Sequence, residues 1–141
     1  LSLREAADRY HTPFGFLSHP VSFFTYSSRF VKGVLKAAHD MGVPVLSADE
    51  WLEFTLARDA AGISDTAWDG QTLAFSVTRG RDGSGLTAMA PIPEGRSVAE
   101  VTLDGQAVEP TVRAVHGRDY ALVPLAAAEV GTVTQVQVRY A

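Results

Sequence analysis

The chain has 141 residues and no cysteine, so neither a disulfide framework nor a thiolate metal site can form. Long apolar runs are missing as well. The longest stretch without Asp, Glu, Lys or Arg runs from Tyr10 to Ser28, and histidines and prolines interrupt it. Because a membrane-spanning helix needs about 20 predominantly apolar residues, the sequence predicts no membrane span.

Charge of one sign is not concentrated anywhere along the chain. The sequence has 12 Lys and Arg residues against 16 Asp and Glu residues, a net charge of −4, and its basic residues are dispersed. A nucleic-acid-binding surface needs clustered basic side chains, so nucleic acid is not an expected partner. The 46% apolar and 20% charged residues are typical of a globular protein and disfavour disorder, collagen and coiled coil.

Residues 27 to 59 show the pattern of a helix, a strand and a second helix. Apolar residues at spacings of three and four predict a helix over 28–41, which Gly42 ends. The apolar run Val43–Leu46 predicts a buried parallel strand. Ser47 and Glu50 have the spacing of a capping box that begins the second helix. With a further short strand predicted over Phe14–Ser18, residues 1–60 are interpreted as an α/β segment.

From Gly62 onward the apolar residues alternate with polar ones, as in strands with one solvated face. Asp104-Gly105 predicts a type I′ hairpin turn between two such strands. Six short strands are expected, at 72–78, 86–90, 98–103, 106–115, 120–125 and 134–140. We therefore expect a small antiparallel β-sandwich over residues 61–141 and an α+β fold overall. Its aromatic residues, Phe75, Tyr120 and Tyr140, are expected to point inward.

His19 is the main candidate for chemistry, because it follows the predicted strand 14–18 at the edge where open α/β sheets bind ligands. A histidine can donate a proton to the leaving group in metal-assisted ester or amide hydrolysis. Two other roles stay open for His19: a half-buried residue that begins a turn before Pro20, and a metal ligand. A serine hydrolase is disfavoured because the chain lacks the G-x-S-x-G elbow.

The motif Phe16-Leu17-Ser18-His19, the helix 28–41 and the segment from Gly42 to Leu52 resemble the closing part of NodB-type polysaccharide deacetylases, over about residues 14 to 58. The resemblance implies the end of a β/α barrel. It also implies that Leu17 lines the pocket for the acetyl methyl group and that His19 is the general acid. The family's metal-binding Asp-Asp pair and His-x-x-x-His motif are absent from these residues.

We therefore expect the chain to be the C-terminal fragment of a metal-dependent deacetylase, inactive alone, whose divalent metal, zinc, is held by an upstream segment of the same polypeptide. The start at Leu1 without a leader agrees with a fragment. The resemblance implies N- or O-deacetylation of a polysaccharide or peptidoglycan by a bacterial exported protein, placed outside the cell or in the envelope. His11 and Trp68 are further candidates for contact with the glycan.

Two alternatives stay open. In the first, the chain is a non-catalytic accessory region whose sandwich binds carbohydrate or supports the neighbouring domain. In the second, residues 1–60 belong to a different hydrolase barrel with the same order of elements. The aromatic-rich stretch from Phe14 to Phe30 fits a packed interface better than a sugar-binding surface.

Overall fold

The structure is a computed structural model that describes residues 2–10, 12–81 and 86–141. The chain forms two compact units, Leu1–Ser47 and Ala48–Ala141, which we call unit 1 and unit 2. The sequence-based boundary between residues 60 and 61 falls inside unit 2, at the junction of a helix with the first strand.

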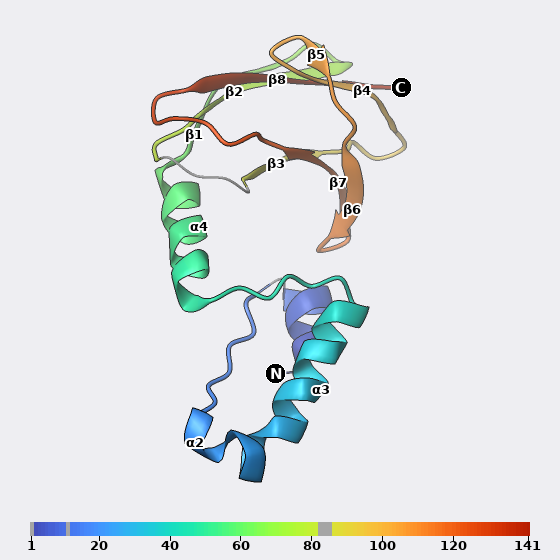
Figure 1. The fold of residues 1–141 in the computed structure, drawn as a ribbon. Helices are drawn as coiled ribbons and strands as arrows, with labels where there is room; N and C mark the ends of the chain where they lie inside the picture. The colour runs from blue at the N-terminus through green and yellow to red at the C-terminus, as the bar shows by residue number, and fades with distance from the viewer. Residues whose placement is uncertain (1, 11, 82–85) are drawn as a thin grey trace. The chain divides into compact units, whose positions relative to one another are not determined.

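Unit 1 consists of helical segments and extended chain (Figure 1). In chain order the segments are α1 (Leu3–Glu5), the π-helix η1 (Ala6–Tyr10), α2 (Pro20–Ser22), the π-helix η2 (Phe23–Ser27) and α3 (Ser28–Asp40). The helix predicted over 28–41 is confirmed as α3. Gly42 follows it with a φ of 65°, the left-handed conformation that the sequence assigned to this stop. The short segments α1, η1, α2 and η2 were not predicted.

The two strands predicted for unit 1, at 14–18 and 43–46, are wrong: the chain is extended there without a ladder. A strand needs a neighbour to satisfy its backbone groups, and none is present among the described residues of this unit. Val45 and Leu46 are 60% and 47% exposed, so the apolar run 43–46 does not lie in a core of this unit. No part of a barrel is found in the described residues, and the α+β class with antiparallel sheets is what the structure shows.

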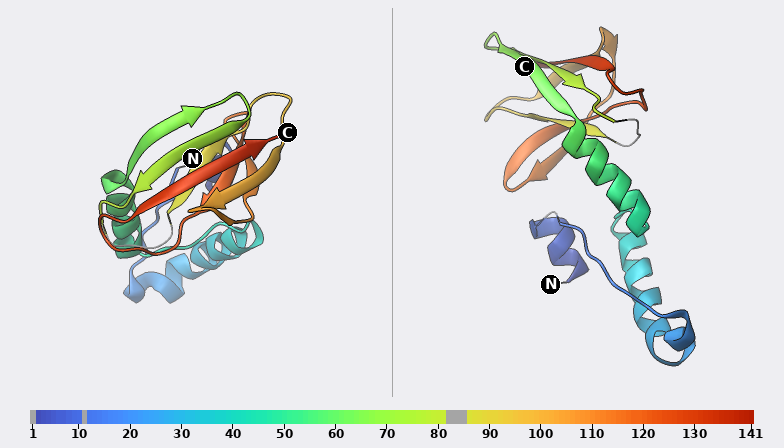
Figure 2. Two further views of the ribbon diagram at one scale, coloured as in Figure 1. Left: turned by 90° about the horizontal axis from the view of Figure 1, so that it is seen from above. Right: turned by 90° about the vertical axis from the view of Figure 1, so that its left-hand side faces the viewer.

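Unit 2 begins with helix α4 (Ala48–Ala60), which runs directly into the first of its strands (Figure 2). The strands in the described residues are β1 (Gly62–Trp68), β2 (Thr72–Thr78), β3 (Thr87–Pro91), β4 (Val98–Leu103), β5 (Gln106–Ala107), β6 (Thr111–Val115), β7 (Arg118–Pro124) and β8 (Val133–Tyr140). They form a large sheet in the order β1-β2-β8-β4-β5 and a small sheet in the order β3-β7-β6. Every pairing is antiparallel.

The core of unit 2 lies between the two sheets, in the arrangement of a β-sandwich. Phe75, Val101, Val136 and Val138 from the large sheet meet residues of the small sheet such as Val123. Helix α4 contributes to the same cluster through the buried Ala57 and the partly buried Phe54. The helix therefore belongs to the sandwich by its packing, although its sequence pattern groups it with the α/β segment.

Two details of the strands differ from the sequence-based expectation. Strand β1 was not predicted, because Ser64-Asp65 breaks the alternation; the structure absorbs the break in a bulge with Asp65 at a φ of 52°. The single strand expected over 106–115 is two, β5 and β6, one in each sheet. Pro110 precedes β6 and has no N–H for a ladder. The hairpin predicted at Asp104-Gly105 is confirmed, with φ values of 50° and 79°.

Candidate functional site

His19 and Leu17 lie on the surface of unit 1, at the end of the extended segment that precedes α2. His19 is the N-cap residue of α2, with φ −90° and ψ 132°, and its side chain makes no capping hydrogen bond. Its carbonyl oxygen accepts a hydrogen bond from the Ser22 N–H at 3.1 Å and from the Ser22 hydroxyl at 3.3 Å. The His19 side chain is exposed, and Leu17 is 84% exposed. The structure thus holds the backbone of His19 and leaves the side chains of both residues accessible.

The surroundings of His19 are apolar. Ser18, Pro20, Phe23 and Phe24 line a small hollow of about 330 Å³ beside it. The Ser18 and Ser27 hydroxyls lie 2.6 Å apart and join this segment to the start of α3. Within the part of the chain that the structure describes, no carboxylate pairs with the His19 ring. Unit 1 by itself therefore offers a proton-donor candidate and an apolar wall, but no group that orients the imidazole.

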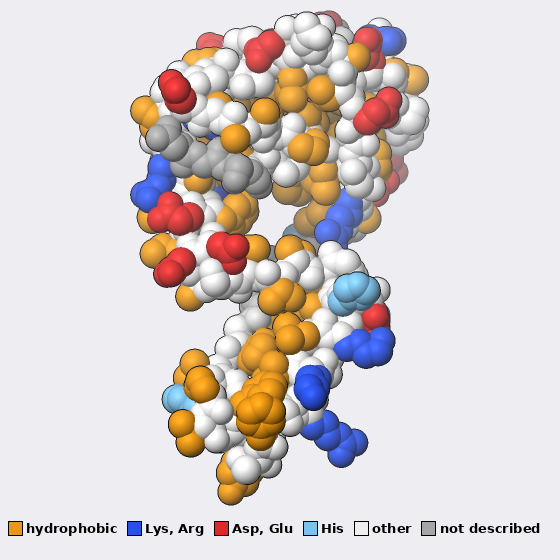
Figure 3. Space-filling model, in the orientation of Figure 1, with side chains coloured by type: hydrophobic (Ala, Val, Ile, Leu, Met, Phe, Trp, Pro, Cys, Tyr) orange, Lys and Arg blue, Asp and Glu red, His pale blue; other side chains and the backbone are white. Residues whose placement is uncertain are grey.

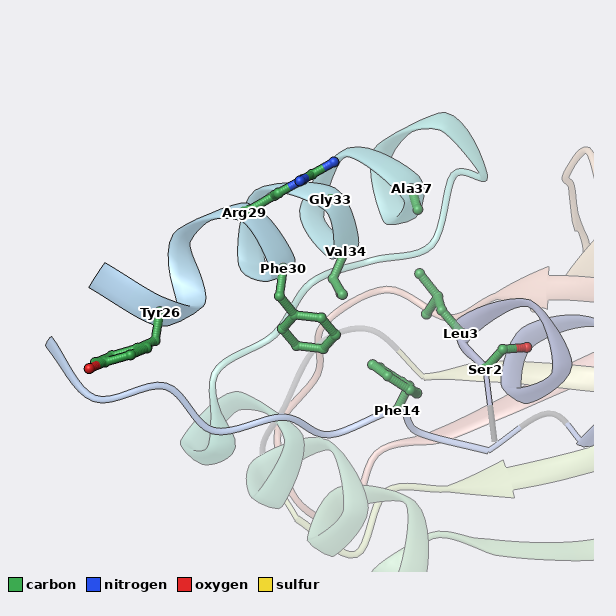
Figure 4. Close-up of a pocket in the computed structure, with 9 residues that line it drawn as sticks. All are labelled: Ser2, Leu3, Phe14, Tyr26, Arg29, Phe30, Gly33, Val34 and Ala37. Carbon is green, nitrogen blue, oxygen red and sulfur yellow. The ribbon is translucent and has the colours of Figure 1, made fainter. Parts of the chain in front are cut away.

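A larger open hollow of about 730 Å³ lies along α3. Figure 4 shows Phe30 and Val34 directed from α3 toward Phe14 of the extended segment and Leu3 of α1. The remaining lining residues are Ser2, Tyr26, Arg29, Gly33 and Ala37. In the space-filling view of this unit, hydrophobic side chains gather on one side of α3 and Lys and Arg on the other (Figure 3).

The aromatic-rich stretch of unit 1 is packed only in part. Phe16 and Phe30 meet edge to face at 5.9 Å between ring centroids, and Phe23 and Phe24 do so at 5.4 Å. Yet Phe24 and Tyr26 are 88% and 86% exposed. Among the described residues of the unit, the buried apolar side chains are Ala6, Val31 and Ala38. The stretch therefore leaves much of its apolar area uncovered within this unit.

The metal that the resemblance implies does not fit the residues present. No group of three His, Asp or Glu side chains that could hold an ion occurs in residues 2–10, 12–81 and 86–141. His39 sits on the exposed last turn of α3 beside Asp40, at 3.6 Å, which is a pair and not a ligand set. We therefore derive no chemical step through a metal from this chain.

Of the two other predicted glycan contacts, His11 and Trp68, the structure describes only Trp68. His11 lies outside the described residues. Trp68 ends β1 opposite Leu73, on the core side of the sheet, and is 49% exposed. Its ring meets that of Tyr140 at 5.8 Å, and the Arg96 guanidinium lies over it, also at 5.8 Å. A sugar that stacked on the ring face under Arg96 would have to displace that cation.

Tyr120 is a candidate surface-binding residue that the sequence interpretation missed. It was expected to point inward, but Ala121 and Val123 are the fully buried residues of β7, so Tyr120 and Leu122 face the other side of the small sheet. The inward-facing positions of β7 are therefore displaced by one residue from the expected ones. The useful signal was present in the sequence: the small Ala121 and the branched Val123 alternate with larger neighbours, as core positions of a closely packed sandwich do.

No helix in the described part of the chain is long and apolar enough to cross a membrane. The resemblance to NodB-type deacetylases depends on the motif Phe16-Leu17-Ser18-His19 and on an order of elements of which the structure contains the helices α3 and α4 but neither of the two predicted strands. Comparison with protein-family models, curated proteins and solved structures gives no match to this chain.

Proposed function

We propose that this chain is a C-terminal part of a metal-dependent polysaccharide deacetylase-like hydrolase, in which unit 1 contributes Leu17 and His19. The observation that carries the proposal is that these two side chains are both exposed and lie two residues apart in sequence, with His19 fixed as the N-cap residue of α2. The open apolar surface around them supports it, since a second segment of the polypeptide can cover that surface and complete the site.

In this role the His19 imidazolium would donate its proton to the nitrogen or oxygen that leaves when the acetyl group is cleaved. Leu17 would contact the acetyl methyl group. The attacking water and the groups that activate it must come from other residues of the polypeptide, so the chain alone is inactive. A polysaccharide or peptidoglycan substrate, and a place outside the cell or in its envelope, belong to the same proposal.

The test uses the complete polypeptide that contains this chain. Its coding sequence before residue 1 is expected to include an Asp-Asp pair and a His-x-x-x-His motif. His19→Ala is then expected to lower the turnover of an acetylated glycan by about a hundredfold to ten-thousandfold, whereas His39→Ala, on the exposed end of α3, should leave it unchanged. Full turnover by His19→Ala, or a coding sequence without these motifs, would overturn the proposal.

A second candidate function is an accessory module for carbohydrate binding, and unit 2 favours it. The sandwich has its own core between two sheets, to which α4 contributes Ala57 and Phe54. Binding of a glycan by the 141-residue chain, without any metal, would support this function. The absence of binding to any glycan would leave unit 2 with a structural role only.

A further inference from the structure

We infer that the outer face of the small sheet of unit 2 binds acidic polysaccharides, and that Tyr120, Arg113 and Arg118 are its contact residues. We call this surface the Tyr120 face; it consists of Pro91, Arg113, Arg118, Tyr120 and Leu122. The inference rests on the accessory function proposed for unit 2 and does not depend on the deacetylase assignment of unit 1.

The register of the small sheet places these side chains together. Pro91, Tyr120 and Arg113 are directly opposite one another on β3, β7 and β6. Residues opposite each other share a face of the sheet, and the buried Ala90 and Ala121 show that the core lies on the other face. Arg118 precedes Tyr120 by two residues and so lies on the same side.

The charge of this face differs from that of the whole chain. The side chains directed outward from β3, β6 and β7 are Thr87, Met89, Pro91, Thr111, Arg113, Val115, Arg118, Tyr120, Leu122 and Pro124. They include two arginines and no Asp or Glu, although the chain as a whole has a net charge of −4. On the outer face of the large sheet, in contrast, Arg139 is paired with Glu100 at 3.0 Å.

A face with an aromatic ring, two arginines and no acidic residue fits a sugar that carries a carboxylate. A tyrosine ring beside the apolar ring of a proline offers an apolar strip to the C–H face of a pyranose. Arg113 and Arg118 are exposed, and as a diagonal cross-strand pair these two residues lie roughly 7–8 Å apart. Arginine binds carboxylates through two parallel charge-assisted hydrogen bonds. A neutral glycan would gain only the contact with the tyrosine and proline rings.

The size of the face argues against a protein partner. The three strands are about 4.8 Å apart and have five, seven and five residues at about 3.3 Å each, so they present roughly 270 Å² in projection. A stable protein–protein interface buries about 800 Å² on each partner. A saccharide chain that lies across three strands needs no larger surface, so a glycan is the occupant that the dimensions favour over a second copy of the chain.

The test measures binding of the 141-residue chain to polygalacturonate and to its fully methyl-esterified form, which has the same backbone without the charge. We expect retention by polygalacturonate that weakens as salt is added, and weak or no retention by the ester. Tyr120→Ala and Arg113→Gln should each lower the affinity by about tenfold. Arg139→Gln is the matched control, because it removes one exposed positive charge from the outer face of the large sheet.

The outcomes separate the inference from the accessory function. Equal binding of both polymers, or loss of binding in Trp68→Ala but not in Tyr120→Ala, would overturn the Tyr120 face and keep the accessory function. No binding to either polymer, nor to any other glycan, would overturn both. A dimer in solution that Tyr120→Ala dissociates would assign the face to protein contact instead. If Tyr120→Ala does not fold, Arg113→Gln, a substitution of an exposed residue, still tests whether the Tyr120 face binds the glycan.

Discussion

Tyr140 carries a polar group into the core of unit 2. The residue is fully buried, and its hydroxyl donates a hydrogen bond to the Pro91 carbonyl oxygen at 2.8 Å, joining the large sheet to the end of β3. Removing the hydroxyl leaves that carbonyl without its partner. We expect Tyr140→Phe to lower the free energy of unfolding by about 1 kcal/mol, as measured by denaturant unfolding at neutral pH.

The same residue predicts a dependence on alkaline pH. Burial raises the pKa of Tyr140 above its ordinary value of 10.0. Above that pH the unfolded chain releases the phenolic proton while the folded chain keeps it, so the free energy of unfolding falls as pH rises. Tyr140→Phe should show a shallower decline above about pH 10 than the parent chain. Identical declines in the two proteins would contradict the shifted pKa.

Arg79 is a second buried residue of unit 2 whose contribution to the free energy of unfolding can be measured by substitution. Its side chain is 2% exposed, and Nη2 donates to the Ala126 carbonyl oxygen at 2.6 Å. Its Nη1 has no hydrogen-bond partner among the described residues. A buried cation with an unsatisfied donor is costly, and an apolar side chain of similar length often does as well in its place.

We therefore expect Arg79→Met to change the free energy of unfolding by less than about 1 kcal/mol. Arg79→Ala should lower it by about 2 kcal/mol or more, because it also leaves a cavity. Thermal and denaturant unfolding of both variants would measure the difference. A loss in Arg79→Met as large as that in Arg79→Ala would show that the guanidinium group, and not only the volume of the side chain, stabilises the fold.

At the scale of secondary structure, the contact of α4 with the sandwich is the feature that sequence reasoning did not find. Gly80 follows β2 and lies against the end of α4, where a Cβ on this glycine would overlap the Ala60 carbonyl and come within 2.8 Å of the Ala60 Cβ. Local patterns around residue 60 showed only the end of a helix. The contact is between residues 20 positions apart, which no local pattern encodes.

Gly80→Ala tests that contact. We expect it to lower the stability of unit 2 by about 2 kcal/mol, since helix and sheet must move apart to admit the methyl group. Gly62→Ala is the matched control: a Cβ at Gly62 meets nothing within 4 Å, so its effect should be small. Equal effects of the two substitutions on the unfolding transition would show that α4 is not tightly packed at this point.

Elements with a strong pattern of their own were predicted well. Helix α3 has apolar residues at helical spacing and a glycine stop, and β4 occurs within the predicted bounds. Strands that depend on a partner were predicted poorly. The extended segments 14–18 and 43–46 have the composition of strands but no neighbour in their unit, whereas β1 has a broken pattern and is held by its pairing with β2.

At the scale of the whole molecule, the two units differ in how much they bury. Among the described residues of unit 1 the buried apolar side chains are Ala6, Val31 and Ala38, whereas those of unit 2 form one continuous cluster. Hydrophobic burial is the main stabilising contribution to a fold. We therefore expect unit 1 to open at a lower free energy than unit 2.

Native-state hydrogen exchange of the 141-residue chain would measure this difference. The amides of α3 should exchange through openings of lower free energy than those of β2 and β8 at the centre of the large sheet. A glycan that binds the Tyr120 face should protect β6 and β7 and leave α3 unchanged. Equal protection of α3 and β8 would contradict the lower free energy of opening expected for unit 1.

The sequence by itself determined the properties that depend on composition and short-range pattern. These are the absence of disulfides, the helix α3, the antiparallel strands of residues 61–141 and the turn at Asp104-Gly105, because each follows from side-chain chemistry within a few residues. Tertiary structure alone decided which sheet each strand joins, that α4 packs on the sandwich, and that Tyr120 faces outward. Those outcomes depend on contacts between distant residues and on register, which only the packed chain specifies.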